Sequence, residues 1–203
     1  MGVSAESTGL RERKKEQKRG RLKDAALELF AERGFDDVTV DEVAERAEVS
    51  KSTLFRYFET KEDLILADTR GHGDAFLAAF AERPVDEPVL SSLRAAVHSL
   101  VSNVQADRAR FQRRTRIVAD SPTLSSRSLE RQIEWEDGLA RAILPRFPDR
   151  DDAEARASVI AAATLAVVRI ATRRWVAAED ASSLEDHLLP AFDVLADELK
   201  GAD

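Results

Sequence analysis

The stretch FAERGFDDVTVDEVAERAEVSKSTLFRYFETKEDL, residues 30–64, predicts two short helices separated by a tight turn. Thr39 and Glu42 can form a capping box at the start of the first helix, and Ser50 can cap the second. Two short helices joined in this way form a helix-turn-helix, whose second helix enters the major groove of DNA. The stretch therefore predicts a DNA-binding domain.

The second of these helices carries side chains that suit a DNA contact. Leu54 and Phe58 lie four residues apart and are expected in the core. The side chains left largely outside are Lys51, Ser52, Phe55, Arg56 and Tyr57, while Ser50 and Thr53 lie in the first turn. The N–H groups of the first turn can bind phosphate, Arg56 can make a bidentate contact to guanine, and Phe55 can touch thymine methyl groups. The alternatives are that Phe55 packs inside and that the lysines are ordinary solvated charges.

Residues 49–62, VSKSTLFRYFETKE, closely resemble the N-terminal signature of the TetR family of bacterial regulators. That signature is an apolar residue, S, K, a small residue, T, L, an aromatic, any residue, Y or H, F, any two residues, K and E. The preceding F-x3-G-F-x3-T-V-x2-V-A pattern of residues 30–44 fits as well, whereas Glu48 stands where the family usually has glycine. The resemblance implies that Tyr57 and Lys61 hold the DNA backbone on either side, with Thr39 near the start of another helix.

Charge is distributed unevenly along the chain. The net charge of −7 alone argues against nucleic acid, because binding phosphate requires Lys and Arg. Residues 11–23, however, contain eight basic side chains against Glu12 and Glu16. We expect this basic run to follow a phosphate strand or the minor groove; the alternative is a solvated helix face.

The whole chain is predicted to be all-α, because Gly and Pro are scarce and no segment alternates with period two. About nine helices are expected. Residues 1–64 would form an N-terminal arm and the helix-turn-helix domain, and residues 65–203 a ligand-binding and dimerisation domain. Gly71 and Gly73 are expected to interrupt the fourth helix.

Several classes of protein are disfavoured by composition. The chain has no cysteine, and His72, His98 and His187 lie far apart, so neither a metal site nor a catalytic residue is predicted. The first ten residues do not form a signal peptide, so a cytoplasmic protein of the bacterial nucleoid is expected. The apolar stretch 157–171 is predicted to be a buried helix, too short to span a membrane.

The last two helices are expected to form the interface of a homodimer. The family's usual dimer pairs these helices as a four-helix bundle. Residues 157–171 are apolar on nearly every side, and Leu184, Leu188 and Phe192 form an apolar face on the final helix. The alternative is that both helices are internal to one subunit.

By resemblance, a small-molecule inducer binds among the fourth to eighth helices, with no resident cofactor. The candidate lining residues are Phe76, Phe80, His98, Phe111, Trp135 and Arg169. Arg169 could meet an anionic ligand, or pair with a carboxylate of residues 134–137. Residues 135–143, WEDGLARAI, and 173–175, RRW, are similar to an actinobacterial subgroup with mycofactocin-associated regulators, which implies an acyl-CoA-like ligand.

The predicted function is a repressor that leaves a palindromic operator in double-stranded DNA when its ligand binds. An enzyme is the first rival, but no phosphate loop or clustered acid–base set is present. A helical protein-interaction module is the second, and salt-sensitive binding of duplex DNA discriminates against it. Activation instead of repression stays open, because a fold does not fix the sign of regulation.

Overall fold

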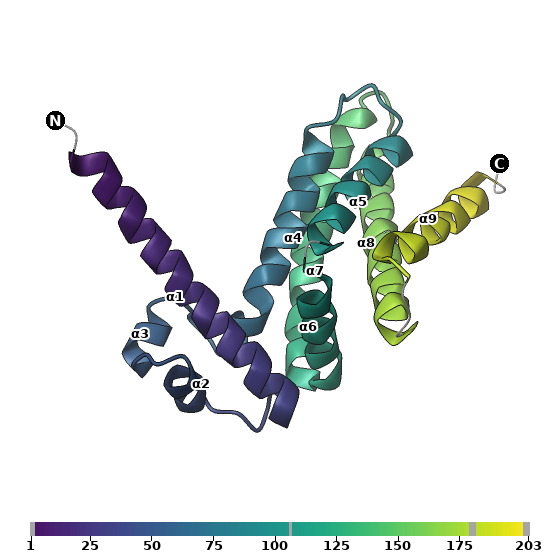
Figure 1. The fold of residues 1–203 in the computed structure, drawn as a ribbon. Coiled ribbons are helices and arrows are strands. Elements are labelled where there is room, and N and C mark those ends of the chain that lie inside the picture. The colour runs from purple at the N-terminus through teal and green to yellow at the C-terminus, as the bar shows by residue number, and fades with distance from the viewer. Residues whose placement is uncertain (1–2, 106, 179–181, 201–203) are drawn as a thin grey trace. The chain divides into compact units, whose positions relative to one another are not determined.

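The computed structural model describes residues 3–105, 107–178 and 182–200 (Figure 1). In these residues all regular secondary structure is helical, which confirms the predicted all-α fold. The helices are α1 (Val3–Arg33), α2 (Val40–Arg46), α3 (Lys51–Phe55), α4 (Asp63–Ala81), α5 (Val89–Gln105), α6 (Arg108–Asp120), α7 (Pro122–Ile143), α8 (Ala153–Ala178) and α9 (Leu184–Lys200), with a 3₁₀ turn η1 (Leu144–Arg146) after α7.

The chain divides into two compact units. Unit 1 contains residues 1–67 together with 116–125, and unit 2 contains residues 68–115 and 126–203. The segment 116–125 comprises the end of α6 and the start of α7, and it supplies Ile117 and Leu124 to the core of unit 1. Nothing in the sequence indicates that a segment from the middle of the chain packs with the N-terminal helices.

The core of unit 1 positions the helix-turn-helix. The inward face of α1 begins at Leu22, which is fully buried, and Leu54 of α3 and Phe58 pack in the same cluster. Gly34 ends α1 with φ of +85°, and its N–H donates to the carbonyl of Phe30. Glu48, in the turn between α2 and α3, also has positive φ, at 55°. Glycine suits this position because the backbone there adopts the left-handed conformation. In that conformation a residue with a side chain, such as Glu48, destabilises the fold by about 1–2 kcal/mol relative to glycine.

The core of unit 2 joins α4, α5, α7, α8 and α9, and α8 packs against α9. Contrary to the expected interruption, α4 is continuous through Gly71 and Gly73. A helix tolerates glycine at a cost of about 1 kcal/mol, and Gly73 has a packing role. A Cβ atom at Gly73 would lie 2.1 Å from Cε2 of Trp135, so the indole rests directly on the α4 backbone.

Helix α8 is longer than its apolar stretch suggested. It is 26 residues long, and among the described helices it alone is long and apolar enough to cross a membrane by length and composition. The expectation that it is too short is therefore wrong, because the helix continues on both sides of residues 157–171. It is also buried on one face only: Ala161 and Leu165 face the core, whereas Val159 and Ile170 are 64% and 45% exposed.

Candidate nucleic-acid interface

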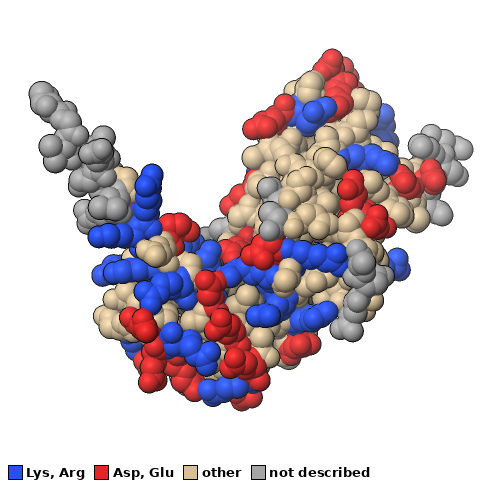
Figure 2. All heavy atoms as spheres, in the orientation of Figure 1, with Lys and Arg blue, Asp and Glu red and all other residues tan. Residues whose placement is uncertain are grey.

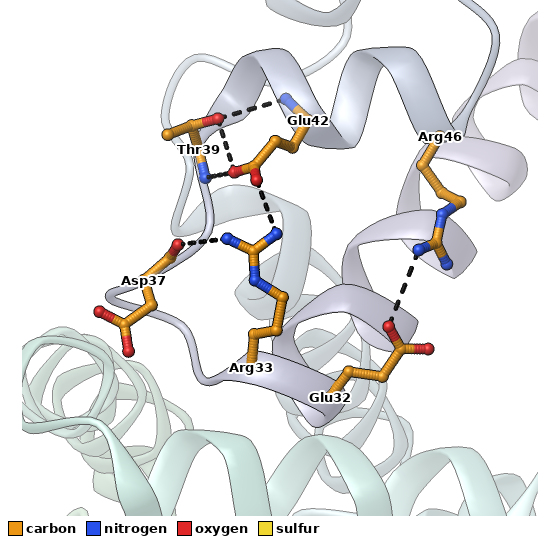
Figure 3. A network of polar contacts seen from close by, with 6 residues as sticks. All are labelled: Glu32, Arg33, Asp37, Thr39, Glu42 and Arg46. Atoms are coloured by element: carbon orange, nitrogen blue, oxygen red, sulfur yellow. Dashed lines mark hydrogen bonds and ion pairs between the residues drawn. The ribbon is translucent and has the colours of Figure 1, made fainter.

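A network of polar contacts fixes the start of α2 (Figure 3). The Thr39 hydroxyl accepts from the N–H of Glu42 at 3.3 Å, and the Glu42 carboxylate accepts from the N–H of Thr39 at 2.7 Å. Arg33, at the end of α1, donates to the second carboxylate oxygen of Glu42 at 2.6 Å and to the carbonyl of Asp37 at 3.0 Å. The predicted capping box is confirmed, and Arg33 ties it to α1.

Replacing Glu42 by glutamine should reduce the loss of stability in acid. The N–H of Thr39, followed by Arg33, lowers the pKa of Glu42 from 4.5 to about 2. Because the pKa is lower in the folded state, the carboxylate stabilises the fold above about pH 4.5 and loses this effect as the pH falls to about 2. Urea unfolding across this range should show a shallower pH dependence for Glu42→Gln. Glu45→Gln, at an exposed neighbour, is the control and should follow the wild type; a wild-type pH dependence for Glu42→Gln would contradict the assignment.

Helix α3 presents most of the predicted contact residues to solvent. Ser50 caps it by accepting from the N–H of Thr53 at 3.2 Å. Leu54 and Phe58 are buried, as predicted. Lys51, Ser52, Phe55 and Arg56 are exposed, as predicted. Tyr57, also expected outside, is half-buried, as is Thr53. Phe55 is 45% exposed, so it does not pack inside the unit.

The two cations of this face have intramolecular partners that they can exchange. Lys51 forms an ion pair with Asp41 of α2 at 2.8 Å, and both side chains are more than half exposed. Exposed pairs of this kind contribute about 0–1 kcal/mol. The guanidinium of Arg56 lies over the ring of Tyr57, 5.4 Å from its centroid. Neither contact is strong enough to hold the cation against a phosphate or a guanine.

Lys61 is turned inward instead. Its ammonium group donates to the carbonyl of Phe35 at 2.5 Å and lies 4.1 Å from the centroid of the Phe35 ring. Partial burial lowers the pKa of Lys61, and Asp36 opposes that shift. In this position Lys61 holds the loop that leads into α2, and a contact to DNA would require it to leave that carbonyl.

Four of the six candidate ligand residues lie in or against the core of unit 2, and the other two do not. Phe76 and Phe80 are buried, Phe111 and Trp135 are half-buried, and His98 and Arg169 are exposed. His98 lies 3.2 Å from a carboxylate oxygen of Glu185. Arg169 therefore does not enter the interior of unit 2, because the apolar helix that carries it is buried on its opposite face.

The buried guanidinium of unit 2 belongs to Arg114, which is 6% exposed. It donates to Nδ1 of His72 at 3.3 Å, lies 3.7 Å from a carboxylate oxygen of Asp68, and sits 4.9 Å from the centroid of the Phe111 ring. Phe111 in turn lies 5.9 Å from Trp175, ring to ring. We call these five residues the Arg114 cluster. Burial, and then the charge of Arg114, lowers the pKa of His72, which favours the neutral ring that accepts this hydrogen bond.

Sequence reasoning missed Arg114 because it lies in a run of arginines, FQRRTR, that a solvated helix face would explain. Among the described residues no group of three or more His, Asp or Glu side chains could hold a metal ion.

Comparisons with known proteins agree with the helix-turn-helix geometry. The sequence model for bacterial regulatory proteins of the tetR family matches residues 22–67, and that for the MftR C-terminal domain matches residues 87–200. The HTH-type transcriptional regulator TcmR of Streptomyces glaucescens is 35% identical over 198 residues, covering 95% of this chain and 87% of TcmR. The mycofactocin biosynthesis transcriptional regulator MftR of Mycobacterium tuberculosis is 27% identical over 174 residues, covering 86% and 87%.

A solved structure shares the fold. NalD, the secondary repressor of the MexAB-OprM multidrug efflux pump in Pseudomonas aeruginosa, superposes with a TM-score of 0.64 at 19% identity, covering 88% of this chain and 96% of NalD. With two family models matching most of its length and a 35% identical relative over nearly all of it, this chain belongs to the TetR family of bacterial transcriptional regulators and carries an MftR-type C-terminal domain.

Proposed function

We propose that this regulator is a homodimeric repressor that binds a palindromic operator through α3 of each subunit and leaves it when a small molecule binds unit 2. The observation that carries the DNA-binding part is the exposed face of α3, where Lys51, Ser52 and Arg56 surround an exposed Phe55. No packing requirement of unit 1 explains an exposed aromatic there. Such a protein acts in the cytoplasm, on the DNA of the nucleoid.

The residues of this face have different roles in the proposal. Arg56 reads a guanine edge, and Phe55 contacts thymine methyl groups or sugar. The remaining candidates position the helix on the backbone: Thr39, Ser50, Lys51, Ser52, Thr53, Tyr57 and Lys61. Of these, Lys61 is partly buried and would have to leave the carbonyl of Phe35 before it could contact DNA.

The dimer is supported by the uncovered face of α8. Val159 and Ile170 on α8 and Val194 on α9 are between 45% and 64% exposed. In a soluble regulator such a face favours a partner, and pairing α8 and α9 of two subunits would bury it. Two-fold symmetry then presents two copies of α3 to the DNA, so the operator should be palindromic.

Two substitutions distinguish a contact that reads the base sequence from a contact that positions the protein on the DNA backbone. Arg56→Ala should relax the preference at one base pair by roughly 1–3 kcal/mol, because it removes a contact to a base. Lys51→Ala should weaken binding to every duplex alike and reduce the slope of log K against log salt by about one. Arg127→Ala, which removes an exposed cation of unit 2 whose partner is Glu130, is the control.

The measurement is fluorescence anisotropy with a palindromic duplex from the DNA beside the gene and with a random duplex, at several salt concentrations. Equal affinity of the wild-type protein for both duplexes would contradict sequence-specific binding. An Arg56→Ala variant that ranks all sites as the wild type does would remove Arg56 from the reading face.

The Arg114 cluster supports an acidic effector. Arg114 is buried beside a carboxylate at 3.7 Å, a distance beyond that of a direct hydrogen bond. The ring of Phe111 lies next to Arg114, and the ring of Trp175 lies next to that of Phe111. A carboxylate or phosphate on the effector could replace Asp68 there, and its apolar part could lie against the rings. An acyl-CoA-like molecule has both features.

The same cluster is well placed to affect DNA binding. The chain passes between the units at residues 67–68 and 115–116, immediately beside Asp68 and Arg114. These are two of the three points at which the chain crosses, and an effector that separates Asp68 from Arg114 changes how the segments beside those two points are tied together in unit 2. In the anisotropy experiment an effector with a tenfold preference for the released state should weaken operator binding by about 1.4 kcal/mol per site, and the operator should weaken effector binding equally. Effector affinities that are identical with and without operator would contradict this role.

A further inference from the structure

The proposed function leaves the basic N-terminal part of α1 without a role. Residues 12–18 and 21 are exposed, while the buried face of this helix begins only at Leu22. At about 1.5 Å per residue, the helix extends roughly 12 Å from Leu22 back to Lys14. The exposed residues 12–18 need another explanation, because they add no apolar burial to the fold.

The charges on this part of α1 are segregated by side. With 3.6 residues per turn, Lys14, Lys18 and Arg21 follow one another at spacings of four and three residues and form a single row, which we call the α1 stripe. Glu12 and Glu16 lie on roughly the opposite side of the helix, where Glu12 pairs with Lys15 at 3.2 Å. Lys and Arg side chains gather along this part of α1 in the space-filling view (Figure 2).

The α1 stripe lies on the side of unit 1 that carries the turn between α2 and α3. Its last member, Arg21, forms an ion pair with Glu48 at 2.8 Å, and Glu48 lies in the turn just before the α3 cap. Arg19 lies over the ring of Phe58, 5.5 Å from the centroid, and this contact fixes the rotation of α1 at the same level. The stripe therefore begins beside the turn before α3 and continues outward from it.

The surplus of charge is large compared with that of the rest of the chain. Residues 11–23 contain eight basic and two acidic side chains, a net of +6. The remaining residues contain 31 − 8 = 23 basic and 38 − 2 = 36 acidic side chains, a net of −13. Lys14 and Lys18 make no ion pair with any described residue. They are free to bind a polyanion that the rest of the surface repels.

We propose that the α1 stripe binds the phosphate backbone of the DNA next to the half-site that α3 contacts. The match to the tetR family model begins at Leu22, and the stripe lies immediately before it. Lys14 and Arg21 are seven residues, or about 10 Å, apart, a length that spans two or three phosphates of one strand. In a dimer the two stripes would lengthen the bound site at both ends without reading its sequence.

This inference rests on the proposed DNA binding, and paired variants of the full-length protein test it. Lys14→Gln/Lys18→Gln removes two charges from the stripe. Arg13→Gln/Lys15→Gln removes the same charge from exposed positions of the same helix outside the stripe. Glutamine keeps the helix propensity, and circular dichroism confirms that both variants fold.

The readout is the salt dependence of binding to the operator and to random duplex. Two lost phosphate contacts should lower the slope of log K against log salt by about 2 and weaken both duplexes by about 30-fold near 0.15 M salt. The Arg13→Gln/Lys15→Gln control should keep nearly the wild-type slope. Equal losses of affinity and slope in both variants would mean that DNA binding depends on net charge and not on the stripe, and would overturn the inference. An unchanged slope in Lys14→Gln/Lys18→Gln would also overturn it. A wild-type protein that binds no duplex would overturn the proposed function as well, so the two failures are distinguishable.

Discussion

Replacing Gly73 by alanine should lower the free energy of unfolding by about 1–3 kcal/mol, even though alanine is the better helix former. The added Cβ atom would lie 2.1, 2.4 and 2.5 Å from three atoms of the Trp135 indole. An indole is rigid and cannot fold away from the contact as the end of a flexible side chain would. Either α4 and α7 separate in unit 2 or Trp135 leaves its rotamer, and each costs packing energy.

Gly71, two residues earlier on the same helix, is the matched control. A Cβ atom there would meet nothing within 4 Å. Gly71→Ala should therefore raise stability by about 0.5–1 kcal/mol, because it restricts the unfolded chain and favours the helix. Urea unfolding at one fixed protein concentration measures both variants, since the stability of a dimer depends on concentration.

A double-mutant cycle isolates the cause of the Gly73 effect. Trp135→Ala has its own cost, but in that background Gly73→Ala should no longer be destabilising, because the ring that it strikes is absent. If Gly73→Ala stabilises the protein in the wild-type background as Gly71→Ala does, then Trp135 does not rest on α4 and the two helices are not locked at this point.

The parts of this structure that follow from the sequence are those fixed by neighbours in the chain. A capping box needs only Thr39 and Glu42, and the burial of Leu54 and Phe58 follows from their spacing of four. The exposure of Arg56 follows from the same helical period. Local rules of this kind operate within about one turn, so they can be read without knowing where the chain goes next.

The parts that do not follow are those in which distant segments meet. Ile117 has the apolar character of any core residue, and nothing at that position indicates that its core is that of unit 1. Lys61 finds the carbonyl of Phe35, 26 residues away. Arg114 is buried and Arg169 exposed because of which side of each helix meets a neighbour. Periodicity shows that a helix has an apolar face, but not which element covers that face.

Glu48 lies between these two cases. Its departure from the usual glycine is visible in the sequence, and the structure shows the conformation at stake, a φ of 55°. The partner that its side chain finds in Arg21 is not visible, since α1 is 27 residues away along the chain. A substitution that costs backbone energy in the turn thus also places an ion-pair partner beside the last residue of the α1 stripe.

Placing a carboxylate on the exposed face of α8 should abolish the dimer. Val159 is 64% exposed and belongs to the face that the proposed pairing of α8 and α9 would bury. Val159→Glu would introduce two carboxylates into one interface, because symmetry places each residue there twice. Burying like charges without partners costs several kilocalories per mole, and about 2.7 kcal/mol already weakens association about 100-fold.

Val85→Glu is the matched control for this substitution. Val85 is 61% exposed and lies in the connector between α4 and α5, outside α8 and α9. The two variants change the same residue type to the same charge at nearly the same exposure, so general effects of charge and of lost apolar surface should cancel between them.

Sedimentation at several protein concentrations should then find Val159→Glu monomeric where Val85→Glu and the wild type are dimeric. Circular dichroism should show that both variants keep their helices, because neither valine is part of the core of unit 2. Operator affinity should fall with the dimer by about 100-fold, since a monomer presents one copy of α3 to a site built for two. If Val159→Glu stays dimeric and binds the operator as Val85→Glu does, the exposed face of α8 is not the subunit interface and the palindrome has to be read by a dimer assembled through another surface.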